Sequence, residues 1–313
     1  MKMKVIPIGF AFDNNLVMPA CICISSLLQN ANADTFYDIF ILSSSSCPLD
    51  KGPLDKLYDY YTNFELHFRV VDATFDQSFQ IRGITPATYY RLMIPELVPE
   101  YEKIIYSDVD VIFREDLSSW YLDTLFDGEY VAGVNSLAHL SPVTHKYYTR
   151  ELEIDSSKII YAGNIILNSK KIREDNLVPK FKEHAYMKYK YQDLDILNIV
   201  CQGKIKYLKP GFCLTTDISE YANIDISKIN TIWNPIEIND ALKTGIVHYN
   251  GQKPWKGACI NFDIWWEYYR KSPFYDAKYY YQFFEDMLNE HDRLPLLKRI
   301  KILFRYFVYG RKK

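Results

Sequence analysis

The sequence predicts an α/β domain built on a mostly parallel central sheet that is flanked by helices. Two observations lead to this fold class. Strand-like apolar runs alternate with helix-like segments from residue 4 to residue 71, and 48% of the 313 residues are hydrophobic while 24% are charged. Alternation at this spacing favours βαβ units with right-handed crossovers, and therefore parallel strands. A chain of this length and composition can form one large domain or two small ones.

The N-terminal half supplies alternating strands and helices. Buried apolar runs predict the strands, and apolar residues at helical spacing predict the helices. The expected strands are Lys4–Phe12, Phe36–Leu42, Phe64–Val71 and Tyr101–Tyr106, and the expected helices are Pro19–Gln29, about Leu54–Tyr61, and Thr88–Leu97. Ligands of such sheets gather at the carboxyl ends of the strands.

The C-terminal half is less regular. Strands are expected over Tyr130–Asn135, Ile159–Leu167 and Gly245–Tyr249, with a helix around Asp193–Val200. No internal repeat or low-complexity linker interrupts the chain. We therefore expect one domain over residues 1–256, followed by a helical region over residues 257–313.

Composition argues against several other classes of protein. Six cysteines without paired spacing speak against a zinc site and a disulfide framework. The start, MKMKVIPIGFAFDNN, meets a charge early and lacks a small-residue cleavage site, so it predicts a first strand and not a signal peptide. No segment has the roughly 18 apolar residues of a membrane span. A reducing cytoplasm is the expected compartment.

The most informative motif follows the strand that ends at Tyr106. Asp108 and Asp110 stand one residue apart where the strand opens into a loop, so both carboxylates can reach one hard cation. Such a cation commonly neutralises a diphosphate. The alternative is a solvated Asp-x-Asp pair, which is frequent in proteins.

A second motif lies near the end of the domain. His248 ends a strand and is followed by Gly251, Lys253 and a Pro-Trp pair, which together offer an imidazole, a close-approach backbone and a compact cation. An imidazole beside carboxylates favours Mn²⁺, with Mg²⁺ as the alternative. A structural histidine and an ordinary surface lysine are the alternative interpretations.

Taken together, five ordered motifs between residues 4 and 256 resemble family 8 retaining glycosyltransferases, which include bacterial lipooligosaccharide galactosyl- and glucosyltransferases and the glycogenins. The motifs are Tyr89-Tyr90-Arg91-Leu92, Ile104 to Asp110, Ala162 to Asn168, Tyr191 to Asn198, and His248 to Trp255.

This resemblance implies a GT-A fold, a UDP-hexose donor, and Mn²⁺ bound by Asp108, Asp110 and His248. It implies donor contacts from residues in five parts of the chain, and a catalytic role for two of the charged ones together with Asp195. The donor-binding set is Ala11, Asp13, Asn15, Arg91, Val109, Asp193, Gly251 and Lys253, and the catalytic set is Asp193, Arg91 and Asp195.

Structural alternatives apply to several of these residues. Arg91 could pair with an acid at the edge of the core, and Asp13 could simply form the turn before the first helix. Asp193 and Asp195 could be the solvated start of a helix, where carboxylates interact favourably with the helix dipole.

The sequence departs from the family pattern at three positions. Leu194 stands where these transferases commonly have Gln, and leucine cannot act as a nucleophile. We therefore expect front-face displacement, with covalent catalysis by Asp193 or Asp195 as the alternative. Leu16 replaces a frequent aromatic residue, and Tyr161 replaces a frequent Asn before Ala-Gly, so the donor sugar could be galactose, glucose or an N-acetyl form.

These features predict a metal-dependent retaining hexosyltransferase that acts on a glycan or glycolipid acceptor at the inner face of a bacterial membrane, as in lipopolysaccharide synthesis. Alternatives are a sugar-nucleotide hydrolase, a transferase that acts on a glycosylated protein, and a catalytically silent UDP-sugar-binding protein.

The C-terminal tail differs electrostatically from the rest. Residues 293–313 carry eight basic side chains and no acidic one, while the whole chain has a net charge of −2. Apolar residues recur there at helical spacing, as is typical of a helix that lies on an anionic membrane surface. A helix packed on the domain or on a second subunit is the alternative. Nucleic acid is not an expected partner, because the remaining chain is acidic and lacks a recognition motif.

Overall fold

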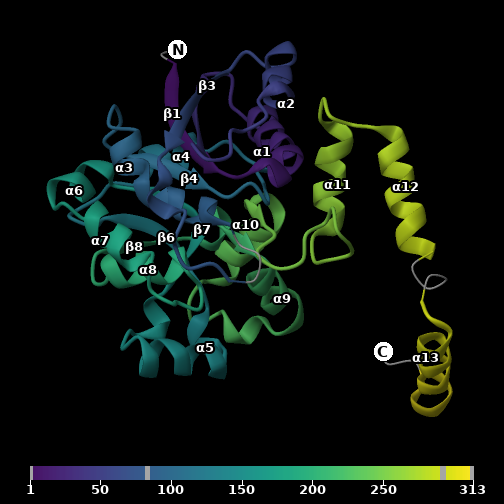
Figure 1. The fold of residues 1–313 in the computed structure, drawn as a ribbon. Coiled ribbons are helices and arrows are strands. Elements are labelled where there is room, and N and C mark those ends of the chain that lie inside the picture. Colours follow the sequence, from purple (N-terminus) through teal and green to yellow (C-terminus); the bar gives the residue numbers. More distant parts are fainter. Residues whose placement is uncertain (1–2, 82–84, 290–293, 311–313) are drawn as a thin grey trace. The chain divides into compact units, whose positions relative to one another are not determined.

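A computed structural model describes residues 3–81, 85–289 and 294–310, and it confirms the predicted fold class (Figure 1). The central sheet has seven strands in the order β3-β2-β1-β4-β7-β6-β8. These strands are β1 (Lys4–Ala11), β2 (Thr35–Ser44), β3 (Phe64–Val71), β4 (Ile104–Ser107), β6 (Val131–Asn135), β7 (Ile160–Leu167) and β8 (Ile205–Leu208).

The central sheet is mostly parallel. β1 is parallel to β2 and β4, β2 is parallel to β3, and β6 is parallel to β8. Within the described part of the central sheet, only β7 is antiparallel to its neighbours, which are β4 and β6. Because Phe10 pairs with Ser107, the loops that follow β1 and β4 leave the same edge of the sheet.

A small second sheet begins directly after the turn that follows β4. It consists of β5 (Val111–Ile112), β10 (Val247–His248) and β9 (Leu214–Thr215), in the order β5-β10-β9. β5 follows the Asp-x-Asp motif at once, and its antiparallel pairing places His248 opposite Val111. The end of the predicted Gly245–Tyr249 strand is thereby brought to a motif that lies far from it in the sequence.

Most predicted helices are present. The longer α-helices are α1 (Val17–Gln29), α7 (Val178–His184), α8 (Asp193–Val200), α9 (Thr216–Ile224), α10 (Pro235–Thr244), α11 (Phe262–Lys271), α12 (Ala277–Leu288) and α13 (Leu296–Tyr309). Short helices are α2 (Gly52–Asp55), α3 (Ile94–Leu97), α4 (Ser118–Asp123), α5 (Pro142–Lys146) and α6 (Ser169–Glu174).

Two predicted helices have a different local geometry. The segment expected at about Leu54–Tyr61 is the short α2 followed by a 3₁₀ turn over Lys56–Asp59. The segment expected over Thr88–Leu97 is a 3₁₀ helix over Pro86–Met93 that continues into α3. Pro95 lies in the first turn of α3 and lacks the N–H that an uninterrupted α-helix would use, which explains the break.

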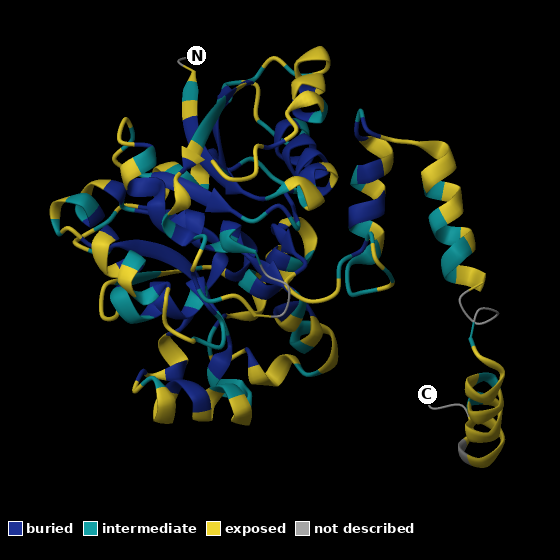
Figure 2. Ribbon diagram, in the orientation of Figure 1, coloured by how far each residue is buried: buried dark blue, intermediate teal, exposed yellow. Residues whose placement is uncertain are grey.

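The core lies on both faces of the central sheet. All of β7 is buried, and Ile6, Ile8 and Phe10 of β1 are fully buried. Figure 2 shows this buried interior beneath an exposed outer layer of helices. Burial on both faces is the reason that these strands appear in the sequence as continuous apolar runs.

The chain divides into two compact units, residues 1–273 and 274–313. The first contains both sheets and also α11, whose Trp265, Trp266 and Tyr269 are buried. The domain boundary expected after residue 256 stays a prediction. The second unit contains α12 and α13.

The basic tail coincides with α13. Lys298, Arg299, Lys301 and Arg305 lie on this helix, as do exposed Leu297 and Phe307. The other predicted basic residues, Arg293, Arg311, Lys312 and Lys313, lie outside the described residues. No helix in the described ranges is long and apolar enough to cross a membrane.

Candidate functional site

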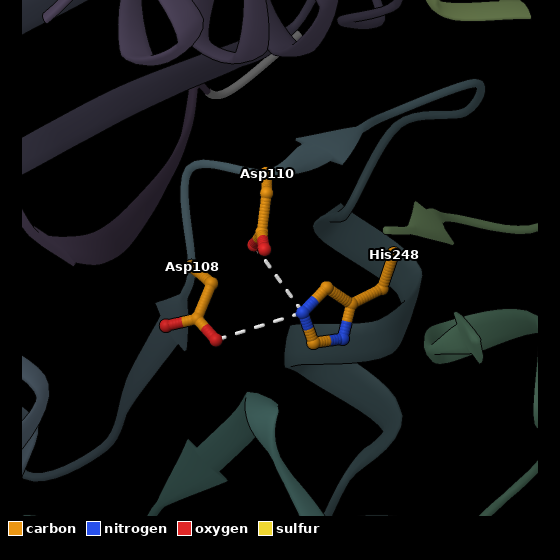
Figure 3. Close-up of side chains that lie close together, drawn as sticks. All are labelled: Asp108, Asp110 and His248. Carbon is orange, nitrogen blue, oxygen red and sulfur yellow. Dashed lines mark ion pairs between the residues drawn. The ribbon is translucent and has the colours of Figure 1, made fainter. Parts of the chain in front are cut away.

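Three predicted metal ligands meet at the edge shared by the two sheets. Asp108 and Asp110 lie in the turn between β4 and β5, and His248 ends β10. Their ligand atoms all lie within 4.8 Å of one another. The Nε2 atom of His248 is 3.3 Å from Asp110 Oδ1 and 3.6 Å from Asp108 Oδ2 (Figure 3). Two carboxylates and an imidazole can therefore act as a single ligand set.

Gly163 provides the space for this cluster. A Cβ atom at this position would lie 2.8 Å from Asp108 Oδ2 and would overlap the His248 ring. The carbonyl oxygen of Gly163 also accepts a 2.7 Å hydrogen bond from the Asp108 N–H. Gly163 was not among the predicted site residues, although it lies in the Ala162-Gly163-Asn164 part of one of the five ordered motifs.

The electrostatics of Asp110 suit a bound cation. Its Oδ1 atom is buried and has no hydrogen-bond partner within the described chain, while Oδ2 accepts a hydrogen bond from Lys253 Nζ. Burial opposes ionisation of Asp110, but the charges of Lys253 and His248 hold its pKa below the usual value. A buried, ionised oxygen that faces the His248 imidazole at 3.3 Å without forming a well-aligned hydrogen bond to it is chemically suited to a metal ion.

His248 is also held in place. Burial disfavours its charged form, yet the adjacent Asp110 carboxylate raises the pKa of His248 to about 10. Its Nδ1 atom lies 3.6 Å from the sulfur of buried Cys213, which the sequence interpretation did not select. This contact on the second ring nitrogen leaves Nε2 directed at the two carboxylates.

Arg91 connects the metal cluster to α8. It is buried, its Nη2 lies 2.7 Å from Asp108 Oδ1, and its Nε lies 3.1 Å from Asp193 Oδ2. The guanidinium also stacks on the Tyr106 ring at 4.4 Å. Arg91 thus pairs with buried acids, as the structural alternative supposed, and these acids are themselves predicted site residues.

Asp193 begins α8 immediately after an unusual backbone conformation. Gln192 has φ 48° and ψ −116°, which L-residues rarely adopt. Asp193 accepts a 2.6 Å hydrogen bond from Thr88 Oγ1. Burial raises the pKa of Asp193, and the charge of Arg91 opposes that rise. Asp193 is not solvated, so the simple helix-start alternative is wrong for it.

Asp195 is buried in a different set of contacts. It accepts hydrogen bonds from the hydroxyls of Tyr147 and Tyr148, at 2.6 and 2.8 Å, and from the Tyr191 N–H at 2.8 Å. It is therefore not a solvated residue at the helix start either. Its role in catalysis stays a prediction, because both of its carboxylate oxygens accept hydrogen bonds from tyrosine hydroxyls.

The remaining predicted donor residues lie at the end of β1 and in the segments that follow β1, β4 and β10. Ala11 ends β1, and the Asp13 carboxylate accepts from the Asn15 N–H, which makes it a helix cap as well as a candidate uridine ligand. Val109 lies between the two metal-binding acids and is buried. Gly251 lies in the loop after His248. Their contacts with a donor stay predictions.

The three departures from the family pattern have distinct surroundings. Leu194 is partly buried and packs on the hydrophobic core beside Asp193. Tyr161 is buried, and its hydroxyl donates a 3.0 Å hydrogen bond to Asp217. Leu16 is half-buried in the turn before α1.

Comparison with known proteins agrees with the family that the ordered motifs resemble. The pattern of glycosyl transferase family 8 matches residues 7–259. A Haemophilus influenzae protein, named provisionally as a glycosyltransferase, is 25% identical in an alignment of length 295 that covers 85% of this chain and 83% of that protein.

Solved structures share the fold. The galactosyltransferase LgtC in complex with donor and acceptor sugar analogues superposes with a TM-score of 0.69 at 20% identity, covering 88% of this chain and 99% of that one. The bifunctional glycosyltransferase WbbM in its apo form gives a TM-score of 0.71 at 20% identity, and the match covers 88% of this chain and 51% of that protein.

Because the family pattern covers most of the sequence, the chain belongs to glycosyltransferase family 8. It is a glycosyltransferase with a GT-A fold, as the ordered motifs implied.

Proposed function

We propose that this glycosyltransferase is metal-dependent and retaining, and that it moves a hexose, galactose or glucose, from a UDP-sugar to a glycan or glycolipid acceptor. The observation that carries the proposal is the cluster of Asp108, Asp110 and His248 with Lys253 beside it. Two oxygens and one imidazole nitrogen favour Mn²⁺, and Mg²⁺ is the alternative.

The chemistry requires that negative charge be stabilised on a leaving diphosphate. A divalent cation held by Asp108, Asp110 and His248 would supply most of this stabilisation. Lys253, which pairs with Asp110 in the absence of a ligand, is close enough to donate to a phosphate oxygen as well. Such donors are most effective in a buried site where water is excluded.

Sugar transfer is proposed to proceed by front-face displacement. The acceptor hydroxyl attacks the anomeric carbon on the side from which UDP leaves, and the β-phosphate oxygen takes the hydroxyl proton. Asp193 is suited to orient a sugar hydroxyl because Arg91 and Thr88 fix its carboxylate. Asp195 supports α8 through Tyr147 and Tyr148, which makes Asp193 the better candidate if a covalent intermediate forms.

A second candidate function is suggested by Leu194. An apolar side chain next to Asp193 is compatible with a catalytically silent protein that binds UDP-sugars. UDP release from UDP-Gal, UDP-Glc and their N-acetyl forms, measured with Mn²⁺ and with a panel of acceptors, separates the two. Turnover of one donor that Asp110→Asn abolishes supports the transferase. Tight UDP binding without turnover of any donor supports the silent protein, and release without transfer identifies a hydrolase.

The location of the enzyme is proposed to be the cytoplasmic face of the cell membrane, with a role in bacterial cell-surface glycan synthesis. Support comes from α13, which interleaves Lys298, Lys301 and Arg305 with exposed Leu297 and Phe307. Basic residues near an anionic surface add roughly 1 kcal/mol each to membrane binding.

A further inference from the structure

A second recess in the first unit is separate from the metal cluster. It has a volume of about 660 Å³ and lies between the segment that contains Phe79 and Ile81, the α5 region, and residues 188–190. In Figure 1, α5 lies at the lower end of the first unit. No residue assigned above to metal or donor binding lines this groove, so it has no role in the proposed function so far.

The groove has a positive charge. Lys146, Lys188 and Lys190 line it, against Glu151 as its acidic residue. Within the described ranges, neither Lys146 nor Lys188 forms an ion pair, so neither ammonium group is neutralised there. Lys190 is held more firmly, since its ammonium group stacks over the rings of Tyr147 and Tyr191 at 5.5 and 5.2 Å.

Aromatic and aliphatic side chains line the same groove. Phe79, Tyr147 and Tyr189 provide ring surface, and Val143 provides an exposed apolar patch. Ring faces beside charged donors form the kind of lining that holds a sugar with a negative group, because the pyranose C–H face packs on a ring while lysines meet the anion.

The groove is connected to the predicted reaction centre. Tyr147, in its wall, accepts a 2.9 Å hydrogen bond from the Lys190 N–H and donates one to Asp195 on α8. On the opposite side, the Phe79 carbonyl accepts a 3.2 Å bond from Gln192, which immediately precedes Asp193. One layer of side chains therefore links the groove lining to the residue proposed to orient the donor sugar.

We infer that this groove binds the acceptor, and that the acceptor is an acidic saccharide that carries a carboxylate, sulfate or phosphate. The inference rests on the proposed transferase function and adds the chemical class of its second substrate. Lys146 and Lys188 would contact the acidic group, and the half-buried Phe79 and Tyr189 would pack against a sugar ring.

The test uses oligosaccharides in matched pairs, one neutral and one acidic, presented to the full-length protein with UDP and Mn²⁺. We expect the wild type to bind acidic members at least tenfold more tightly than their neutral partners. The double variant Lys146→Gln with Lys188→Gln should lose this preference. The double variant Lys180→Gln with Lys243→Gln, which removes two exposed lysines on α7 and α10 that do not line the groove, is the charge-matched control and should keep it.

Donor hydrolysis without acceptor separates this inference from the proposed function. If the wild type and the double variant Lys146→Gln with Lys188→Gln release UDP equally fast, the donor site of the variant is intact. A rise in the acceptor KM of the variant with little change in kcat then supports acceptor binding in the groove. Equal binding of neutral and acidic members overturns the inference, as does competition by inorganic phosphate as strong as that of the acidic oligosaccharide. Absence of UDP release by the wild type both without acceptor and with every oligosaccharide tested contradicts the transferase itself.

Discussion

At the scale of single residues, the site depends on the absence of a side chain at Gly163. The Gly163 carbonyl accepts a 2.7 Å hydrogen bond from the Asp108 N–H, so the backbone at Gly163 cannot shift to accommodate a Cβ atom without disturbing Asp108. The His248 ring and the Asp108 carboxylate would have to move instead. Small displacements of ligand-orienting groups commonly cost 10- to 100-fold in metal affinity.

We therefore predict that Gly163→Ala lowers Mn²⁺ affinity by about tenfold or more. The matched control is Gly133→Ala on β6, where the added Cβ would meet the flexible end of Ile160 and no site residue. Calorimetric titration of Mn²⁺ into both variants measures the difference. Equal affinity in the two variants would show that Gly163 is not needed for the cluster.

Arg91 is the charged residue that pairs with buried Asp193 and half-buried Asp108. Its removal leaves Asp193 without its ion-pair partner within the described chain, and breaking a buried pair of this kind costs about 3–5 kcal/mol. Asp193 already has a raised pKa because of burial, and loss of the Arg91 charge would raise it further.

The pH dependence of Arg91→Met follows from this shift. A carboxyl whose folded-state pKa lies above its ordinary value of 3.8 favours the folded state only when protonated, so stability is lost as pH rises past that value. We expect the stability gap between Arg91→Met and wild type to be larger at about pH 7.5 than at about pH 4. Denaturant unfolding at both pH values measures it.

Arg114→Met is the control for this experiment. Arg114 donates to the carbonyls of Ala241, Leu242 and Gly245 and bonds no carboxylate within the described chain. Its loss should destabilise the protein by a similar amount at both pH values. A stability gap for Arg91→Met that does not change with pH would contradict the assigned role of Arg91.

At the scale of secondary structure, α13 is a basic amphipathic helix for which the sequence already predicted a membrane role. Substituting Lys298, Lys301 and Arg305 by Glu in the full chain reverses the charge but retains the apolar residues. Each basic residue contributes roughly 1 kcal/mol at an anionic surface. We expect the triple variant to lose at least about tenfold in binding to phosphatidylglycerol vesicles in co-sedimentation.

Vesicles of neutral phosphatidylcholine are the control for α13. Wild type and variant should bind them equally, because only the charge has changed. If both proteins also bind the anionic vesicles equally, α13 packs on protein and does not bind a membrane surface.

At the scale of the whole molecule, the metal cluster joins two sheets. Asp108 follows β4 of the central sheet, and His248 belongs to β10 of the small sheet. A ligand that binds only the folded state stabilises it by about 2.7 kcal/mol at a concentration 100 times its Kd. Mn²⁺ should therefore raise the unfolding temperature of the wild type, and chelation should reverse the rise.

Mn²⁺ binding should also release a proton. The pKa of His248 is raised to about 10, so its imidazole is charged at neutral pH and must lose a proton to become a ligand. We expect apparent Mn²⁺ affinity to rise with pH until the pH approaches that value. Calorimetry in two buffers of different ionisation enthalpy counts the protons, and a count of zero would mean that His248 is not a ligand.

Much of the fold could be predicted because its strands are buried on both faces. Runs such as Lys4–Phe12 and Ile159–Leu167 are mostly apolar in the sequence and agree closely with β1 and β7. The antiparallel direction of β7 could not be predicted, because burial on both faces gives the same apolar run in either direction. β8 was missed because this short edge strand is only half-buried and contains a lysine.

The sequence by itself determined the elements, the order of the motifs and the types of side chain at the site, because local periodicity and residue chemistry are written along the chain. The tertiary structure alone decided which of these side chains meet. It placed His248 opposite Val111 across a two-residue strand, set Gly163 against the His248 ring, and directed Asp193 to Arg91 but Asp195 to two tyrosines. Such contacts depend on how strands pair and on the backbone angles of one residue, Gln192, and neither is determined by neighbours in the sequence.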